Sequence, residues 1–522
     1  MGRYKEFTIM FSGILFSKTE NSTQTPPREM PECFRDLNLD QIFGQISREM
    51  SEYGLERYFF MPLTDPDEIT YRQDIMKDLE NIRIRKAVSD FSGTVSRLGR
   101  DMREIRSSIA SDPKNDNYLS KGRILEYAED YCGAVRSLLE EAAGADLRSA
   151  GLKAFFAYLR EHAESERFEK LEKESAELRE KLSEVRYSML IKNSTIRVRK
   201  YEGQEDQTVP ILESFEKFRQ GDVKDYRRRM SEEPYASHVE AAVLNLVAGL
   251  YRETFGELDR FCRDHTDFGD DIVIRFSEEV QFYIIWLEYI RQFQDMGLRF
   301  HYPVITEEKK HIYADSCFDM ALACRTKEET VTNSFSLDDP ERIIVVTGPN
   351  QGGKTTFARM FGQIHYLAGL GVSVPGAASV LYVPDRLLTH FEREEDLSTL
   401  NGKLQDELVR LGDVLRAASP SCLVIINEIF ASTTLKDALM LGGLMMDQLA
   451  ELGAMAVIVT FLDELALHGE ETVSMMSTVP DGDPSQRTFK VIRKAPDGLA
   501  YAMHMARKHE LTYEQLDRRL KR

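Results

Sequence analysis

A glycine-rich loop between an apolar segment and a helical segment constrains the fold of this 522-residue chain more than any other feature. Residues 343–347 read Ile-Ile-Val-Val-Thr, a run typical of a buried strand, and residues 357–370 have the apolar pattern of a helix. The nine residues between them fit the phosphate-binding pattern G-x-x-x-x-G-K-[ST] in its strand–loop–helix context. The sequence therefore predicts a nucleotide site formed by Gly348, Pro349, Asn350, Gln351, Gly352, Gly353, Lys354, Thr355 and Thr356.

The residue types in this loop suit the chemistry of phosphate binding. Glycines let backbone N–H groups wrap around phosphates, and the start of the following helix adds a favourable dipole. Lys354 supplies a positive charge toward the β- and γ-phosphates, and the Thr355 hydroxyl can ligate Mg²⁺. The alternative interpretation is a glycine-rich turn with an incidental lysine.

A second apolar run supplies the acid that a phosphoryl-transfer site needs. Residues 423–428 read Leu-Val-Ile-Ile-Asn-Glu, so Glu428 ends a predicted strand and is a candidate base for the attacking water. Asn427 stands where an Asp usually holds Mg²⁺ through water, and its neutral amide adds no charge. Alternatively, Glu428 is only a surface carboxylate at the end of a strand.

The hydrophobic period divides the chain into three parts. Residues 1–64 are an N-terminal segment and linker, and residues 65–298 read mostly as long helices. Within the helical part, residues 187–203 alternate around an Asn-Ser turn signal, which predicts two short strands. From residue 299 to 522, apolar runs alternate with helical patterns, which predicts a parallel α/β sheet with strands at 343–346, 379–383, 423–426 and 456–460.

Composition excludes several classes of protein. No run approaches the ~18 apolar residues that a membrane helix needs, so we expect a cytoplasmic protein with no membrane partner. Six scattered cysteines without a C-x-x-C pair predict neither a disulfide framework nor a zinc cluster. The net charge of −19 argues against a body coated for nonspecific DNA binding, although it leaves room for a local basic surface.

The motifs resemble the ATPase domain of the MutS family. The family loop T-G-P-N-x-G-G-K-[ST] matches residues 347–355 throughout. The segments at 371–376, 428–437 and 460–465 are similar to the family's G-x-x-V-P-A, E-I-G-R-G-T-S-T-x-D-G and T-H-Y-x-E-L. Residues 396–408 follow the spacing of its signature segment, D-L-x-x-x-x-S-x-F-x-x-E-M.

This resemblance implies an α + α/β architecture: a long-helix core and lever region with a small β clamp remnant, followed by a P-loop ATPase domain of the ABC type. It implies ATP and Mg²⁺ as cofactors and a homodimer, in which the signature residues Gly402 and Lys403 approach the nucleotide of the partner. Three positions depart from the family pattern: Gly402 replaces a Ser, Asn427 an Asp, and Phe461 a His. The adenine would lie near residues 331–333.

DNA, double-stranded or branched, is the partner that the resemblance implies, and the clamp would contact it through basic residues. The candidates are Arg197, Arg199, Lys200, Arg227, Arg228 and Arg229. Phosphate contacts without base readout would suit them, and ordinary solvated charge is the alternative. Three functions stay open: a dimeric ATPase clamp in mismatch repair, DNA-structure sensing or recombination, an ABC-type ATPase acting on a protein partner, and a nucleotide-gated clamp with little hydrolysis.

Overall fold

A computed structural model of the chain describes residues 11, 13–18, 27–192, 195–204, 238–326, 330–392, 403–430, 433–480, 487–496 and 512–513. The chain forms two compact units, which are discontinuous in sequence. The first contains Met1–Arg85, Leu147–Lys153 and Glu279–Arg522, and the second contains Lys86–Asp146 and Ala154–Glu278. None of the described helices combines the length and the apolar composition that a membrane crossing requires.

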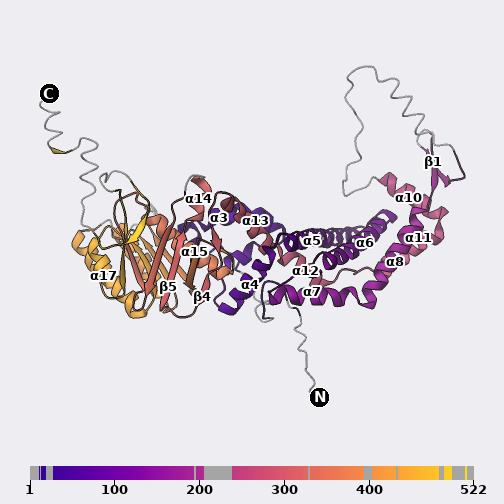
Figure 1. Ribbon diagram of the computed structural model, residues 1–522. Helices are drawn as coiled ribbons and strands as arrows, with labels where there is room; N and C mark the ends of the chain where they lie inside the picture. Colours follow the sequence, from indigo (N-terminus) through magenta and orange to yellow (C-terminus); the bar gives the residue numbers. More distant parts are fainter. Residues whose placement is uncertain are drawn as a thin grey trace, which may run out of the picture. The chain divides into compact units, whose positions relative to one another are not determined.

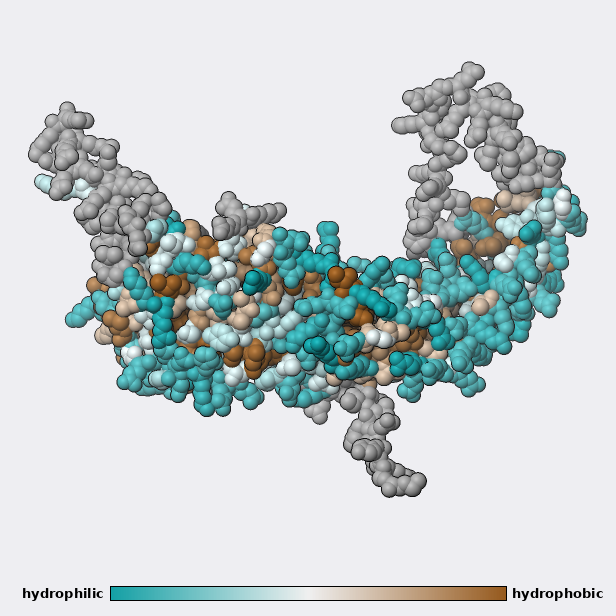
Figure 2. All heavy atoms as spheres, in the orientation of Figure 1, coloured by the Kyte–Doolittle hydropathy of each residue, from teal (hydrophilic) through white to brown (hydrophobic). Residues whose placement is uncertain are grey.

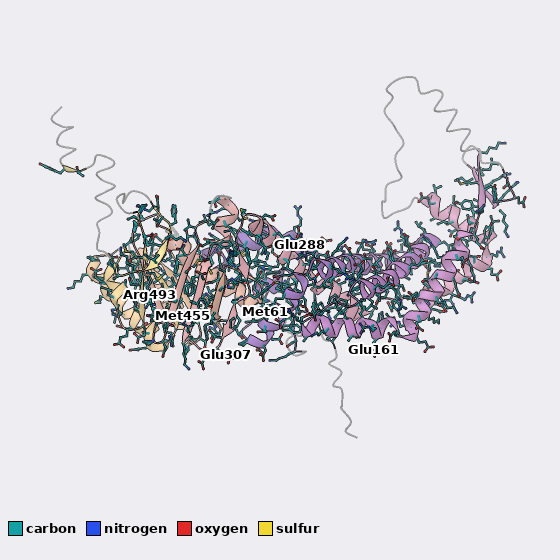
Figure 3. All side chains as sticks on the ribbon, in the orientation of Figure 1. Met61, Glu161, Glu288, Glu307, Met455 and Arg493 are labelled. Atoms are coloured by element: carbon teal, nitrogen blue, oxygen red, sulfur yellow. The ribbon has the colours of Figure 1, made fainter. Side chains whose placement is uncertain are left out.

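The central feature of the first unit is a six-stranded sheet with the order β10-β11-β12-β7-β13-β14 (Figure 1). All neighbours are parallel except the pair of β13 and β14. Its strands are β7 (Ile343–Thr347), β10 (Leu387–Phe391), β11 (Leu423–Asn427), β12 (Met455–Val459), β13 (Thr472–Ser477) and β14 (Val491–Arg493). β7, β11 and β12 are buried along their whole length, as uninterrupted apolar runs predict for a sheet covered on both faces. Figure 3 labels Met455 at the start of β12 and Arg493 at the end of β14.

Helices cover both faces of this sheet. One face packs on α17 (Leu435–Leu452) and α16 (Lys403–Ala417), which share an apolar cluster with alternate residues of β7, β11 and β12. On α15 (Lys354–Leu370), a Cβ added to Gly362 would meet Ile425, a β11 residue outside that cluster. The alternation of α15, α16 and α17 with β7, β11 and β12 produces the predicted α/β layers.

A second sheet differs from the prediction for residues 379–383. It has the order β4-β9-β5-β6, from β4 (Val304–Thr306), β9 (Ala378–Tyr382), β5 (His311–Cys317) and β6 (Asn333–Asp338). The predicted strand exists as β9, but it pairs parallel with β4 and antiparallel with β5 instead of joining the main sheet. An apolar run indicates a strand, whereas its partners depend on segments that are distant in sequence.

Helices from both ends of the helical region pack within the first unit. α13 (Gln281–Asp295) is buried through most of its length and contacts α3 (Leu39–Glu52) and α4 (Pro66–Leu79). Residues 65–85 and 279–298, which the sequence assigns to the helical region, therefore lie in the same unit as the main sheet. The other elements of this unit are α2 (Cys33–Asp36), η1 (Glu56–Phe60), β3 (Phe300–His301), α14 (Met320–Thr326), β8 (Val374–Pro375) and η3 (Asp463–Leu467).

The second unit consists of helices and one hairpin. Phe155 and Phe276 stack in its interior with ring centroids 3.3 Å apart. Hydrophilic residues dominate its face in Figure 2. The two strands predicted within residues 187–203 are present as β1 (Tyr187–Lys192) and β2 (Thr195–Lys200). Its helices include η2 (Pro113–Asn115), α6 (Tyr118–Glu141), α8 (Glu166–Ser183), α10 (His238–Leu250) and α11 (Arg252–Asp264). Three more helices are shared with the first unit: α5 (Ile82–Ser111) and α7 (Ala150–Ala163) begin in it, and α12 (Asp271–Glu279) ends in it.

Candidate nucleotide-binding site

Three strands of the main sheet carry the predicted site residues at their carboxyl ends. The glycine-rich loop follows β7, Asn427 ends β11 with Glu428 directly after it, and Phe461 lies two residues beyond the end of β12. β12 pairs with β11 on one side and with β7 on the other, and all three run parallel. The three strand ends therefore meet at one edge of the sheet, where open α/β sheets bind their ligands.

The loop conformation depends on its glycines. Gly348 and Gly353 have φ angles of 111° and 94°, which residues with a Cβ rarely adopt. At Gly352 the limit is space, because an added Cβ would lie 2.1 Å from Ser477 Oγ and 2.9 Å from the Pro349 carbonyl oxygen. Ser477 ends β13 and donates a hydrogen bond from Oγ to the Gly352 carbonyl oxygen at 2.5 Å. The neighbouring strand β13 thus holds the glycine-rich loop in place through this hydrogen bond.

Lys354 is held back against the loop itself. Its Nζ donates to the carbonyl oxygens of Gly348 at 2.9 Å and Pro349 at 3.1 Å. The ring of Phe461 covers the same ammonium, with its centroid 4.4 Å from Nζ, and only 4% of Lys354 is exposed. The aromatic face and the two carbonyls satisfy the charge in the absence of phosphate.

Burial makes the Lys354 ammonium more acidic than that of an exposed lysine. Loss of solvation lowers the pKa of Lys354 to about 8. The negative charge of Glu428 opposes this shift, Arg487 adds to it, and Asp463 opposes it weakly. The charge of Glu428 therefore acts on Lys354, although the two residues are far apart in sequence.

The two residues predicted to hold Mg²⁺ are in direct contact. Thr355 Oγ1 donates a hydrogen bond to Asn427 Oδ1 at 2.9 Å. A hydroxyl and an amide oxygen are hard donors of the kind that Mg²⁺ accepts, so this pair fits the ion. Both donors are neutral, so they would add no negative charge to balance a bound ion.

Glu428 lies in a constrained turn. Its φ angle is 57°, and its backbone N–H donates to the Val459 carbonyl oxygen at 2.9 Å. Phe430 has a similar φ angle of 58°, and its N–H donates to the Glu407 carboxylate on α16 at 2.7 Å. Glu407 matches the Glu of the signature pattern at residues 396–408, but the pattern does not predict this contact.

Sequence reasoning misses a rim formed by residues 487–491. Arg487 Nε donates to the Asn350 carbonyl oxygen at 2.9 Å. Asn333 Nδ2 donates to the Phe489 carbonyl oxygen at 3.3 Å, and Asn333 Oδ1 accepts from the Val491 N–H at 2.7 Å. The segment expected to lie near adenine is thereby joined to the rim of the loop. Arg487 and Ser477 carry no motif, so only their positions in the fold identify them.

The hairpin of the second unit brings together some of the predicted DNA-contacting residues. Arg197 and Arg199 alternate along β2 and share one face with Lys192, because Lys192 pairs with Thr195. Lys200 points to the other face, where its Nζ lies 5.0 Å from the centre of the Tyr251 ring. Arg227, Arg228, Arg229 and Gly402 lie outside the described residues, as does the side chain of Lys403, the first residue of α16.

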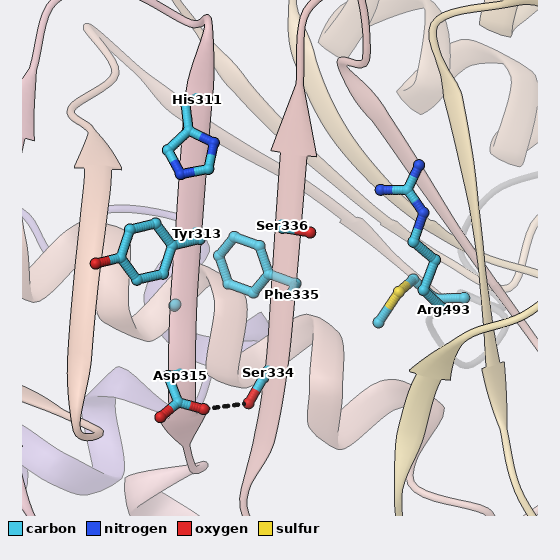
Figure 4. A pocket seen from close by; sticks show the side chains of 9 residues that line it. His311, Tyr313, Asp315, Ser334, Phe335, Ser336 and Arg493 are labelled. Carbon is cyan, nitrogen blue, oxygen red and sulfur yellow. Dashed lines mark hydrogen bonds between the residues drawn. The ribbon is translucent and has the colours of Figure 1, made fainter.

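A separate hollow of about 480 Å³ lies over the second sheet (Figure 4). Four of its polar or charged lining residues have protein partners: Asp315, Ser334, His311 and Arg493. Asp315 accepts from Ser334 at 2.9 Å, His311 contacts Asp338, and Arg493 pairs with Glu341. None of the residues of the glycine-rich loop lines it. It is therefore distinct from the candidate nucleotide site.

Comparison with known proteins identifies relatives of this region. Residues 344–514 match the family described as MutS domain V. An endonuclease MutS2 from Thermus thermophilus is 31% identical over 196 residues, covering 36% of this chain and 26% of that protein. A DNA mismatch repair protein MutS 2 from Halobacterium salinarum is 28% identical over 187 residues, covering 35% of this chain and 22% of that protein.

A third relative extends over the helical region as well. A DNA mismatch repair protein MutS from a Thermotoga species is 22% identical over 463 residues, covering 83% of this chain and 56% of that protein. The chain spans little more than half the length of this relative, and about a quarter of the other two.

Proposed function

We propose that this chain, which belongs to the MutS family, is an ATPase that couples ATP binding and hydrolysis to a grip on DNA. The observation that carries the proposal is the contact of Thr355 with Asn427, beside Lys354 and Glu428, at one edge of the parallel sheet. A glycine-rich turn with an incidental lysine would not require a polar partner at the end of another strand. The relatives named for mismatch repair support DNA as the partner.

The residues at this edge have distinct roles in the proposed reaction. Backbone N–H groups of the loop and the start of α15 bind the phosphates. Lys354 turns from its carbonyl partners toward the β- and γ-phosphates, and Glu428 orients and deprotonates the attacking water. Thr355 and Asn427 would hold Mg²⁺, whose charge favours the developing negative charge on the phosphates.

The proposed grip on DNA uses the basic face of the hairpin. Arg197, Arg199 and Lys192 present positive charges from one face of two paired strands, which suits phosphate contacts. The proposed assembly is a homodimer, in which residues 402–403 of one copy approach the nucleotide of the other. This arrangement follows from the family resemblance.

A nucleotide-gated clamp with little hydrolysis is the second candidate, and the position of Phe461 favours it. The ring covers Lys354 where the family has a histidine, and it provides no proton or hydrogen bond to a γ-phosphate. Asn427 also contributes less charge to the metal than an aspartate. Both changes weaken transition-state stabilisation more than they weaken nucleotide binding.

Steady-state ATP turnover at low salt tests the proposal. The wild-type protein is compared without DNA and with homoduplex, mismatched and four-way-junction DNA. Lys354→Ala serves as the blank and should abolish ATP binding, because the loop loses its cation. Glu428→Gln should bind ATP as the wild type does but stop turnover, because the amide cannot take the proton.

Each outcome discriminates between the functions. Stimulation by one form of DNA supports the DNA-coupled ATPase and identifies the preferred shape. Tight ATP binding with negligible turnover, raised by Phe461→His or Asn427→Asp, supports the gated clamp. Turnover that responds to a protein but to no DNA supports an ABC-type ATPase with a protein partner. Unchanged ATP affinity in Lys354→Ala overturns the nucleotide site.

A further inference from the structure

A buried carboxylate on α16 contacts the chain directly after the proposed base. Glu407 is 7% exposed, and its Oε1 accepts a hydrogen bond from the Phe430 N–H at 2.7 Å. Phe430 lies two residues after Glu428. A side chain from α16, the helix that precedes β11, is therefore hydrogen-bonded to the backbone of the turn that carries the proposed base.

This turn needs external support. Glu428 and Phe430 are not glycines, yet both have left-handed φ angles, 57° and 58°. Such conformations are unfavourable for residues that carry a Cβ, and they persist only where the surroundings impose them. Val459 accepts from the Glu428 N–H, Glu407 accepts from the Phe430 N–H, and the Phe430 carbonyl oxygen accepts from the Thr433 N–H at 3.4 Å. The turn is thus anchored on both sides of the Glu428 side chain.

The apolar residues of the turn supplement these two bonds. Ile429 and Phe430 are buried in the cluster that α16 and α17 form with the main sheet. Leu411, one turn after Glu407 on α16, belongs to the same cluster. Apolar packing is not directional, so it keeps the turn buried without setting the orientation of its peptide groups. A hydrogen bond is directional and therefore sets the orientation of the peptide plane. The direction of Glu428 then depends on the acceptor at residue 407.

We propose that Glu407 is a positioning residue, which orients Glu428 toward the attacking water through the Phe430 peptide. This inference rests on the proposed function and deepens it. Glu407 lies about one helical turn after Lys403, the first residue of α16.

A matched pair of variants separates the hydrogen bond from the packing. Glu407→Gln keeps an oxygen acceptor at the same distance along the side chain. Glu407→Met keeps length and volume but removes the acceptor. The full chain is used for each variant, with ATP affinity measured at equilibrium and ATP hydrolysis measured in single turnover at saturating ATP. Thermal unfolding is recorded in parallel.

Glu407→Met should slow hydrolysis by about tenfold or more with ATP affinity unchanged, because small misplacements of a reacting group cost rates of this order. Glu407→Gln should hydrolyse ATP at close to the wild-type rate. In a Glu428→Gln background, Glu407→Met should cause no further loss of the residual turnover. A purely structural role would instead change stability and leave the rate per folded molecule unaltered.

Hydrogen exchange at the Phe430 amide gives a readout that does not depend on turnover. Protection should be lost in Glu407→Met and kept in Glu407→Gln. Three results would each overturn the inference. Glu407→Met and the wild type could hydrolyse ATP at equal rates, or both Glu407 variants could lose hydrolysis rate equally. Glu407→Met could also lower the residual rate of Glu428→Gln further. A wild-type protein whose turnover is insensitive to Glu428→Gln would overturn the proposed function instead, and the exchange data would still decide whether Glu407 anchors the turn.

Discussion

Lys354 shows how far surroundings change the chemistry of one side chain. Its ammonium is buried by two carbonyls and the Phe461 ring, and its pKa falls to about 8 through loss of solvation. In the proposed function, bound phosphates would favour the charged form, so ATP binding should raise the pKa of Lys354 and take up a proton when the pH exceeds about 8. We therefore expect full affinity for ATP below that pH and lower affinity above it.

We expect the dissociation constant of a non-hydrolysable ATP analogue to rise between pH 8 and pH 9.5, approaching about tenfold per pH unit at the upper end. Lys354→Arg is the matched control, because guanidinium keeps its charge over this range and its residual binding should not follow the same slope. Calorimetry in buffers of different ionisation enthalpy measures the proton uptake. Parallel pH profiles for the wild type and Lys354→Arg would contradict the assigned acidity.

Sequence identifies the site residues that are consecutive and misses those that the sheet brings in. The loop at 348–356 and the pair Asn427–Glu428 are predictable, because each follows an apolar strand and has a recognisable pattern. Ser477 and Arg487 support the loop from β13 and from the segment before β14. The neighbour of a strand in a sheet is not encoded in its own residues, so these two contacts are visible only in the fold.

The ends of α15 and α17 offer a comparison between two similar helix caps. Gly371 follows α15 with a φ angle of 74°, and Gly453 follows α17 with a φ angle of 71°. A Cβ added at Gly453 meets nothing within 4 Å, whereas one at Gly371 lies 2.7 Å from Arg72 Cβ. Arg72 is fully buried and donates to the carbonyl oxygens of Leu15 and Leu370.

Gly453→Ala should lower the free energy of unfolding by about 1 kcal/mol, the cost of a left-handed residue with a side chain. Gly371→Ala should lower it by about 2–4 kcal/mol, because overpacking against the buried aliphatic stem of Arg72 adds to that cost. Urea unfolding of the two variants and the wild type measures the difference. Equal losses would mean that Arg72 moves aside without cost.

The strand at 378–382 shows what an apolar run predicts and what it leaves open. The run correctly indicates a strand, yet β9 belongs to the second sheet rather than to the main one. Strand formation depends on local side chains, while sheet membership depends on which edges are free when the chain folds. The hairpin at 187–200 is easier to predict, because its two strands are adjacent in sequence.

The proposed contact with DNA has to be confined to a local surface, because the molecule as a whole is acidic. The chain carries a net charge of −19, and the hairpin presents Arg197, Arg199 and Lys192 from one face. Arg199 and Lys200 are adjacent in sequence but lie on opposite faces. Substituting either residue by Gln therefore removes one charge from one face of the hairpin, and the two variants form a matched pair.

Arg199→Gln should weaken DNA binding and reduce the salt dependence of log K by about 0.9, the value for one lost phosphate contact with duplex DNA. Lys200→Gln should change both quantities less, because Lys200 is engaged by the Tyr251 ring. Binding is measured by fluorescence anisotropy between about 50 and 200 mM salt. Equal effects of both substitutions would indicate that the face of the hairpin does not matter.

The discontinuous first unit has a consequence for how the protein is made. Residues 34–79 supply helices whose apolar faces are covered by α13 and α15, and these begin at Gln281 and Lys354. Residues 86–278, which contain the whole of the second unit, leave the ribosome before either cover exists. Because domains fold as units during synthesis, the second unit is complete while the first is still half-built. The nascent chain therefore carries exposed apolar helices at its amino end for the time needed to translate the intervening residues, and chaperones have their longest opportunity to bind it there.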